Sequence, residues 1–122
     1  MRGAMAMLLL ASVAACASTG GGSARNPNVL TLAEIEAADQ MTAWDLVQVE
    51  RPWWLRKRGA TSFSQETPVL VYMHGNRLGG PEQLEQISTI DIREMRYFGA
   101  AEAQARFGLG NVSGAIEIFT RR

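Results

Sequence analysis

The chain has 122 residues, a single cysteine, and 12 basic and 12 acidic side chains that leave no net charge. This balance gives no general attraction to phosphates, so we expect no nucleic-acid partner. One cysteine cannot form a disulfide within the chain, and the length suits one small domain with a modest core.

The first fifteen residues have the pattern of a secretion signal. The basic Arg2 precedes an uncharged, mostly apolar stretch over residues 4–15, and small residues stand directly before Cys16. The stretch is too short to cross a hydrocarbon core of about 30 Å, so a transmembrane helix is not expected. Small residues before a cysteine resemble the bacterial lipobox, in which that cysteine is lipidated and becomes the first residue. The alternative is an ordinary secretion signal with an incidental cysteine.

The lipobox resemblance implies a compartment and an anchor. It implies a signal peptide over residues 1–15, lipid attachment at Cys16, and an outer-membrane location on the periplasmic face. Ala17 agrees with that sorting, since it is not the aspartate that marks the alternative. Several acyl chains hold a protein stably on a bilayer. Residues 16–29 are rich in small and polar side chains without periodicity, and are predicted to form a flexible tether.

The folded domain is expected over residues 30–122, and its first element is a helix. Thr31 and Glu34 have the spacing of a capping box, and apolar residues follow at helical spacing as far as Leu46. The pattern predicts one helix over residues 32–47. Pro52 disfavours a helical conformation at Arg51, so any helix before it ends there.

An aromatic and basic segment follows this helix, with Trp53 and Trp54 as its aromatic members. Its basic members are Arg51, Arg56, Lys57 and Arg58. Such a combination suits a surface that interacts with anionic lipid headgroups. The alternative is that one tryptophan packs in the core while the basic side chains are solvated. Exposure of both tryptophans would distinguish the first interpretation from the second.

The rest of the domain alternates strands with helices. The predicted elements are a buried strand at 69–73, a short return strand at 77–78, a short helix beginning at Pro81, a strand at 90–98, a helix at 100–106 and a last strand at 115–120. Helical crossovers between strands require at least one parallel pair. The sequence therefore predicts an α+β domain with a small mixed β-sheet.

The last strand carries an additional expectation. Alternation in the segment Ala115–Thr120 places Ile116 and Ile118 on one face, where we expect both to be buried. Glu117 and Phe119 then face the other way, so Phe119 requires cover from a helix or from a partner.

Four segments, in this order, resemble the plug domain of TonB-dependent outer-membrane receptors. They are residues 67–79, 90–97, 103–108 and 113–121. The last is the most specific, because its glycine, alternating aliphatic residues, threonine and basic residue are similar to the plug's closing strand. The resemblance covers residues 30–122. It implies a plug-like fold and a non-enzymatic binding module, with an outer-membrane receptor or a periplasmic protein as partner.

The sequence also departs from the plug pattern. His74 stands where the plug has an aspartate before glycine, and no large transmembrane barrel follows, so we expect this chain not to be a transporter. No ligand-binding residue is carried over from the family. We expect no cofactor and no metal.

His74 is the only histidine and the one candidate for catalysis. A His-Gly pair after an apolar strand resembles the oxyanion loop of α/β-hydrolases, but the Gly-x-Ser-x-Gly elbow of that fold is missing. One histidine and one lipidated cysteine cannot supply three metal ligands. We therefore expect His74 and Gly75 to form a turn, because histidine tolerates positive φ better than most residues. A small envelope hydrolase using His74 and a structural membrane-surface module are the alternative functions.

Overall fold

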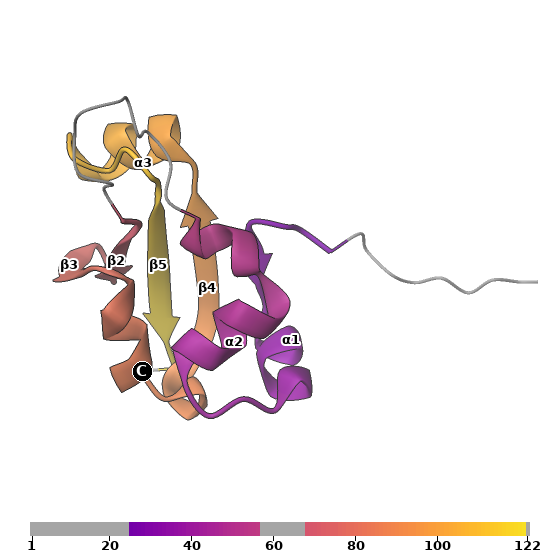
Figure 1. Cartoon of the computed structure of the whole chain (residues 1–122). Coiled ribbons are helices and arrows are strands. Elements are labelled where there is room, and N and C mark those ends of the chain that lie inside the picture. Colours follow the sequence, from indigo (N-terminus) through magenta and orange to yellow (C-terminus); the bar gives the residue numbers. More distant parts are fainter. Residues whose placement is uncertain (1–24, 57–67, 122) are drawn as a thin grey trace, which may run out of the picture.

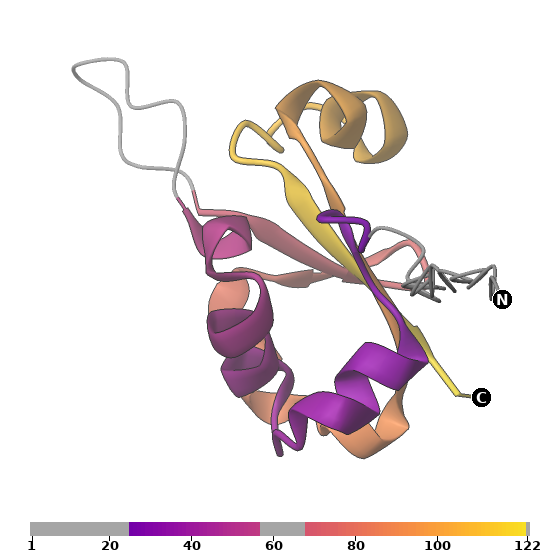
Figure 2. The ribbon, with the colours of Figure 1, turned by 90° about the vertical axis from the view of Figure 1, so that its right-hand side faces the viewer.

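The computed structural model describes residues 25–56 and 68–121. They form a mixed sheet of five strands with helices on both faces, which confirms the predicted α+β class (Figures 1 and 2). The strands are β1 (Val29–Leu30), β2 (Leu70–Met73), β3 (Asn76–Gly79), β4 (Ile92–Phe98) and β5 (Ala115–Thr120). The helices are α1 (Leu32–Ala38), α2 (Ala43–Glu50) and α3 (Ala100–Phe107), with 3-10 helices η1 (Pro52–Leu55), η2 (Pro81–Gln86) and η3 (Thr89–Asp91).

The sheet has the order β1-β4-β5-β2-β3, so the last strand of the chain lies at its centre. β5 pairs in parallel with β2 and antiparallel with β4, and β2 and β3 form an antiparallel hairpin. The parallel pair is the one that the helical crossovers require. Because β5 joins the β1–β4 pair to the β2–β3 hairpin, the sheet would be divided into two parts without it.

The helix predicted over residues 32–47 is wrong, since two helices occupy this segment. The capping box of Thr31 and Glu34 starts α1 as predicted, but α1 ends at Ala38, and its C-cap Asp39 has a left-handed φ of 50°. Thr42 then caps α2 by accepting a hydrogen bond from the Asp45 N–H at 3.2 Å. Asp and Thr side chains form hydrogen bonds readily with nearby backbone groups and so favour helix ends over helix interiors. Asp39 and Thr42 therefore divide the predicted helix into two.

The strand predicted over residues 90–98 begins later, at Ile92. Ile90 lies instead in η3 and is 75% exposed. The chain turns here because Thr89 is held by the loop between α1 and α2. Its N–H donates to the Met41 carbonyl at 3.0 Å, and its hydroxyl donates to the Gln40 carbonyl at 2.5 Å.

The sheet separates two clusters of apolar side chains. The larger cluster lies between the sheet and α1, α2, η1 and η2, and includes Leu30, Leu46, Trp54, Met95, Ile116 and Ile118. The smaller lies under α3, where Leu70, Tyr72, Ala103 and Ala115 pack together. Figure 2 shows α3 on one side of the sheet and α1 and α2 on the other. Ile116 and Ile118 are fully buried, as predicted.

The N-terminal edge of the sheet differs from the predicted domain boundary. Val29 and Leu30 pair with β4 opposite Arg96 and Met95, and Leu30 is fully buried. The tether predicted over residues 16–29 therefore overlaps the folded part, which the structure describes from Arg25 onward. Cys16 lies outside the described residues.

Candidate functional site

The two tryptophans after α2 have different surroundings. Trp54 is fully buried, stacks on Tyr97 at 5.8 Å between ring centroids, and donates its indole N–H to the Pro27 carbonyl at 3.0 Å. Trp53 is half-buried. Trp54 therefore belongs to the core, and the two tryptophans do not form an exposed pair. Arg56 is exposed, while Lys57 and Arg58 lie outside the described residues.

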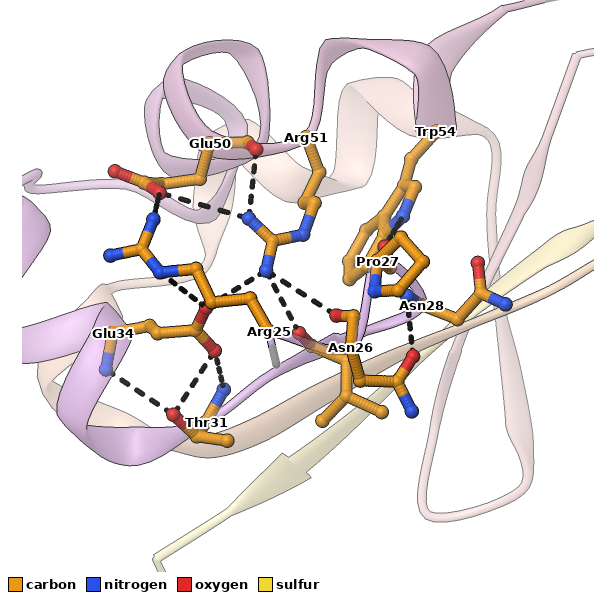
Figure 3. A network of polar contacts seen from close by, with 10 residues as sticks. Arg25, Asn26, Pro27, Asn28, Thr31, Glu34, Glu50, Arg51 and Trp54 are labelled. Carbon is orange, nitrogen blue, oxygen red and sulfur yellow. Dashed lines mark hydrogen bonds and ion pairs between the residues drawn. The ribbon is translucent and has the colours of Figure 1, made fainter. Parts of the chain in front are cut away.

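Arg51 belongs to a buried network rather than to a basic surface patch. Its side chain is 4% exposed, and its guanidinium lies 5.7 Å from the centre of the Trp53 ring. Nη1 donates to the Glu50 carbonyl at 2.9 Å, and Nη2 donates to Glu34 at 2.8 Å and to the Val29 carbonyl at 3.2 Å (Figure 3). A buried cation needs such partners, and helix, strand and N-terminal segment all supply them.

Arg25 completes the charge balance around Arg51. Its guanidinium lies 3.6 Å from Glu34 and 3.8 Å from Glu50, so two cations and two carboxylates alternate (Figure 3). We name the group the N-terminal clasp; its members are Arg25, Pro27, Glu34, Glu50, Arg51 and Trp54. The clasp joins α1, α2 and η1 to the segment that leads into β1. It thereby fixes the point where the predicted tether meets the domain.

Glu34 is the acceptor at the centre of the clasp. Burial by itself would raise its pKa, but the hydrogen bond from the Thr31 N–H at 2.9 Å opposes that effect. Hydrogen bonds from Arg51 and from the Thr31 hydroxyl add to it, so that the pKa of Glu34 lies below its usual value. The ionised carboxylate is therefore the form that the fold stabilises.

His74 and Gly75 form the turn between β2 and β3, with φ of 49° and 82°. Positive φ at both central residues is the geometry of the tightest hairpin turns. His74 Nε2 lies 2.8 Å from the Thr120 hydroxyl and accepts the Thr120 N–H at 3.2 Å. The ring also meets the edge of Phe119. These contacts connect the hairpin to the end of β5.

The described residues contain no group of three or more His, Cys, Asp or Glu side chains that could hold a metal ion. Nor does any helix in this part of the chain have the length and apolar character needed to cross a membrane.

The face of the sheet under α3 contains polar groups that the sequence pattern did not reveal. Glu117 is 1% exposed and forms an ion pair with Arg106 of α3 at 3.0 Å. The Tyr72 hydroxyl donates to Asn111 at 3.0 Å. Phe119 is half-buried, with the Arg96 guanidinium 5.6 Å from its ring centre. The alternation of side chains along β5 predicts that Glu117 lies on this face, but it does not predict that a helix covers Glu117.

Two adjoining grooves open at the end of the sheet where β2 and β5 finish. The larger, about 710 Å³, is lined by Met73, Gln86, Ile87, Ser88, Ile90, Asp91, Thr120 and Arg121. The smaller, about 310 Å³, is lined by Ile35, Glu36, Asp39, Gln40, Met41, Ser88, Thr89, Ile90 and Arg121. Both grooves are lined by Ser88, Ile90 and Arg121. Because they share these residues, we name the two grooves together the double groove. The one sequence feature that could have indicated the double groove is the apolar Ile90, which the pattern places in a strand.

Comparisons of the chain with protein-family models, with curated proteins and with solved structures found no match. Its function is therefore inferred from the geometry described above and from the resemblance of its segments to plug domains.

Proposed function

We propose that this chain is a non-enzymatic, lipid-anchored binding module of the bacterial cell envelope. In this proposal, a lipid on Cys16 holds a plug-like domain at the periplasmic face of the outer membrane. Its partner is an outer-membrane receptor or a periplasmic protein that belongs to the uptake machinery. The proposal joins the lipobox resemblance to the plug resemblance of residues 30–122.

The N-terminal clasp is the observation that carries this proposal. It fastens the segment after the tether to α1, α2 and Trp54, so an anchor on the tether would position the whole domain. Arg25 lies nine positions after Cys16 in the sequence. An extended chain of that length spans at most roughly 30 Å, which would keep the domain close to the membrane.

The arrangement of the plug-like segments gives further support. The four segments correspond to β2 with β3, to β4, to the second half of α3, and to β5. β5 lies between β4 and β2, and α3 packs on the same sheet, so the four form one contiguous unit.

The two alternative functions draw less support from the geometry. A hydrolase would need His74 Nε2 as a base, but this atom already lies against the hydroxyl and the N–H of Thr120. A membrane-surface module would use both tryptophans, yet Trp54 is fully buried. We therefore favour the binding module.

Site-specific photo-crosslinking in intact cells tests the proposal. A photoreactive residue would replace Met41, Val49, Leu78 or Leu109 in turn, since all four side chains are exposed and lie on different elements. We expect a discrete adduct with one partner from at least one position, in the membrane fraction. In a Cys16→Ser background the same adduct should be lost, because the chain would no longer be anchored. If no position gives an adduct, the chain is not a binding module of the envelope.

A further inference from the structure

The double groove has a rigid frame of backbone hydrogen bonds. The Ala43 N–H donates to the Ile87 carbonyl at 2.8 Å, and the Arg121 N–H donates to the Asp91 carbonyl at 2.9 Å. The Thr89 N–H reaches the Met41 carbonyl at 3.0 Å. The loop between α1 and α2, the η3 turn and the end of β5 are thus tied to one another. A ligand that binds here would meet a surface already in place, which lowers the entropic cost of binding.

Two large apolar side chains stand exposed on this frame. Ile90 lines both grooves and is 75% exposed, and Met41, which lines the smaller groove with it, is 82% exposed. Inside the grooves, Met73, Ile87 and Ile35 continue the apolar surface. An apolar side chain placed over Ile90 and Met41 would remove both from water, which favours association.

The charged groups around the double groove select the chemistry of the ligand. Asp91 lines the larger groove, and Asp39 lines the smaller one. Glu36 is paired with Arg121 at 3.0 Å, whereas Asp39 and Asp91 form no ion pair with any other residue in the described part of the chain. Two carboxylates that no cation of the described residues pairs with repel phosphates and anionic headgroups and attract cations.

We propose that the double groove binds a cationic segment of a partner protein. An aliphatic or aromatic side chain of that segment covers Ile90 and Met41, and its Lys or Arg side chains pair with Asp39 and Asp91. This inference rests on the proposed function and names the chemistry of the partner. α2 begins at Ala43 beside the double groove and ends at Glu50 in the N-terminal clasp, so the double groove and the clasp lie at opposite ends of α2.

Fluorescence anisotropy with labelled octapeptides tests the proposal on the protein lacking its signal peptide. One peptide alternates Lys with Leu, a second alternates Glu with Leu, and a third alternates Lys with Ser. We expect the Lys–Leu peptide to bind most tightly, with an affinity that falls as salt is added. Ile90→Ser should weaken its binding about fivefold or more, the loss typical of an important interface side chain.

Matched variants distinguish binding at the double groove from nonspecific binding of the peptide elsewhere on the surface. Asp39→Asn and Asp91→Asn should each weaken binding about two- to fivefold at low salt, as expected for exposed ion pairs. Asn keeps the left-handed backbone that position 39 requires. Leu109→Ser and Glu102→Gln, exposed substitutions in and just after α3, should leave affinity unchanged.

Several results would overturn the inference. The first two are a Glu–Leu peptide that binds as tightly as the Lys–Leu peptide, and control variants that weaken binding as much as the groove variants do. The other two are no binding of the Lys–Leu peptide up to about 1 mM, and sedimentation experiments that show self-association through Ile90. None of these results would change the outcome of the crosslinking experiment in cells, so the inference can fail while the proposed function stands. If no crosslinked partner is found but the Lys–Leu peptide still binds, the proposed function fails while the cationic-ligand site stands.

Discussion

Glu34 brings together helix capping and burial of charge in one side chain. It accepts the Thr31 N–H at the start of α1 and also accepts a hydrogen bond from Arg51, whose other hydrogen bonds go to backbone carbonyls. Arg51 Nε is buried and has no hydrogen-bond partner among the described residues, so within them the guanidinium depends on its two Nη atoms. Removing the carboxylate would leave this buried cation short of its strongest partner.

We expect Glu34→Gln to lower the free energy of unfolding by about 1.5–3 kcal/mol near neutral pH, the range for hydrogen bonds to charged groups. The pKa of Glu34 is lowered in the folded protein, so its contribution is present above the usual glutamate pKa of about 4.3. That contribution is lost as the pH falls through the lowered value. Urea unfolding at pH 7 and near pH 3 measures the difference between wild type and variant, which should shrink in acid. A difference independent of pH would contradict the role of the ionised carboxylate; Glu102→Gln is the exposed control.

His74 adopts a conformation that few side chains tolerate, with φ of 49°. Asn accepts this conformation, so His74→Asn should fold normally and lose less than about 1 kcal/mol, mainly from the contact with Thr120. A β-branched residue does not accept it, and His74→Val should cost about 1–2 kcal/mol more. Chemical denaturation compares the two variants. Equal stability of both would argue against backbone strain as the reason for the choice of residue.

At the scale of elements, the short strand β1 contributes more than its length suggests. Leu30 is fully buried, and the Pro27 carbonyl just before β1 accepts the indole N–H of Trp54. A chain that begins at Arg25 should therefore be fully stable. One that begins at Thr31 should lose at least the roughly 2–5 kcal/mol typical of a deleted buried leucine side chain. Thermal melts followed by circular dichroism compare the two. Identical melting would mean that the domain begins after β1.

The central strand β5 is the element on which the fold depends most. It pairs with β2 and β4, and Ile116 and Ile118 are fully buried. Ile118→Ala should cost about 2–5 kcal/mol. Since small domains are stable by only about 5–15 kcal/mol, deletion of residues 115–122 should abolish the cooperative melt. Removal of Arg122 alone is the control and should leave the melt unchanged. A cooperative melt after the larger deletion would contradict both the sheet order and the plug-like interpretation.

At the scale of the whole molecule, the N-terminal clasp and the double groove lie at opposite ends of α2. A lipid at Cys16 would therefore hold the clasp end near the membrane and leave the double groove available to a partner.

The anchor makes a prediction about the full-length protein in cells. We expect the wild type to incorporate labelled palmitate and to fractionate with membranes, because Cys16 follows a lipobox-like segment. Cys16→Ser should carry no label, and it should be either soluble or uncleaved. Equal label on both proteins would exclude lipidation at this residue.

The local features of the fold could be predicted from the sequence. The capping box at Thr31, the strand predicted at 69–73 and observed at 70–73, the turn at His74 and the alternation in β5 all depend on residues close in the chain. Together with the helices between strands, they were sufficient for the α+β class. Periodicity and capping act over a few residues, so the sequence by itself determines them.

Contacts between distant residues were decided only by the tertiary structure. Arg51 looked like part of a basic surface, but its partners Val29 and Glu34 lie 22 and 17 residues away. Glu117 is buried because α3 supplies Arg106 above it. The double groove combines the loop after α1, the η3 turn and the end of β5. Burial and pairing of charges depend on which elements the folded chain brings together, and no local pattern encodes that choice.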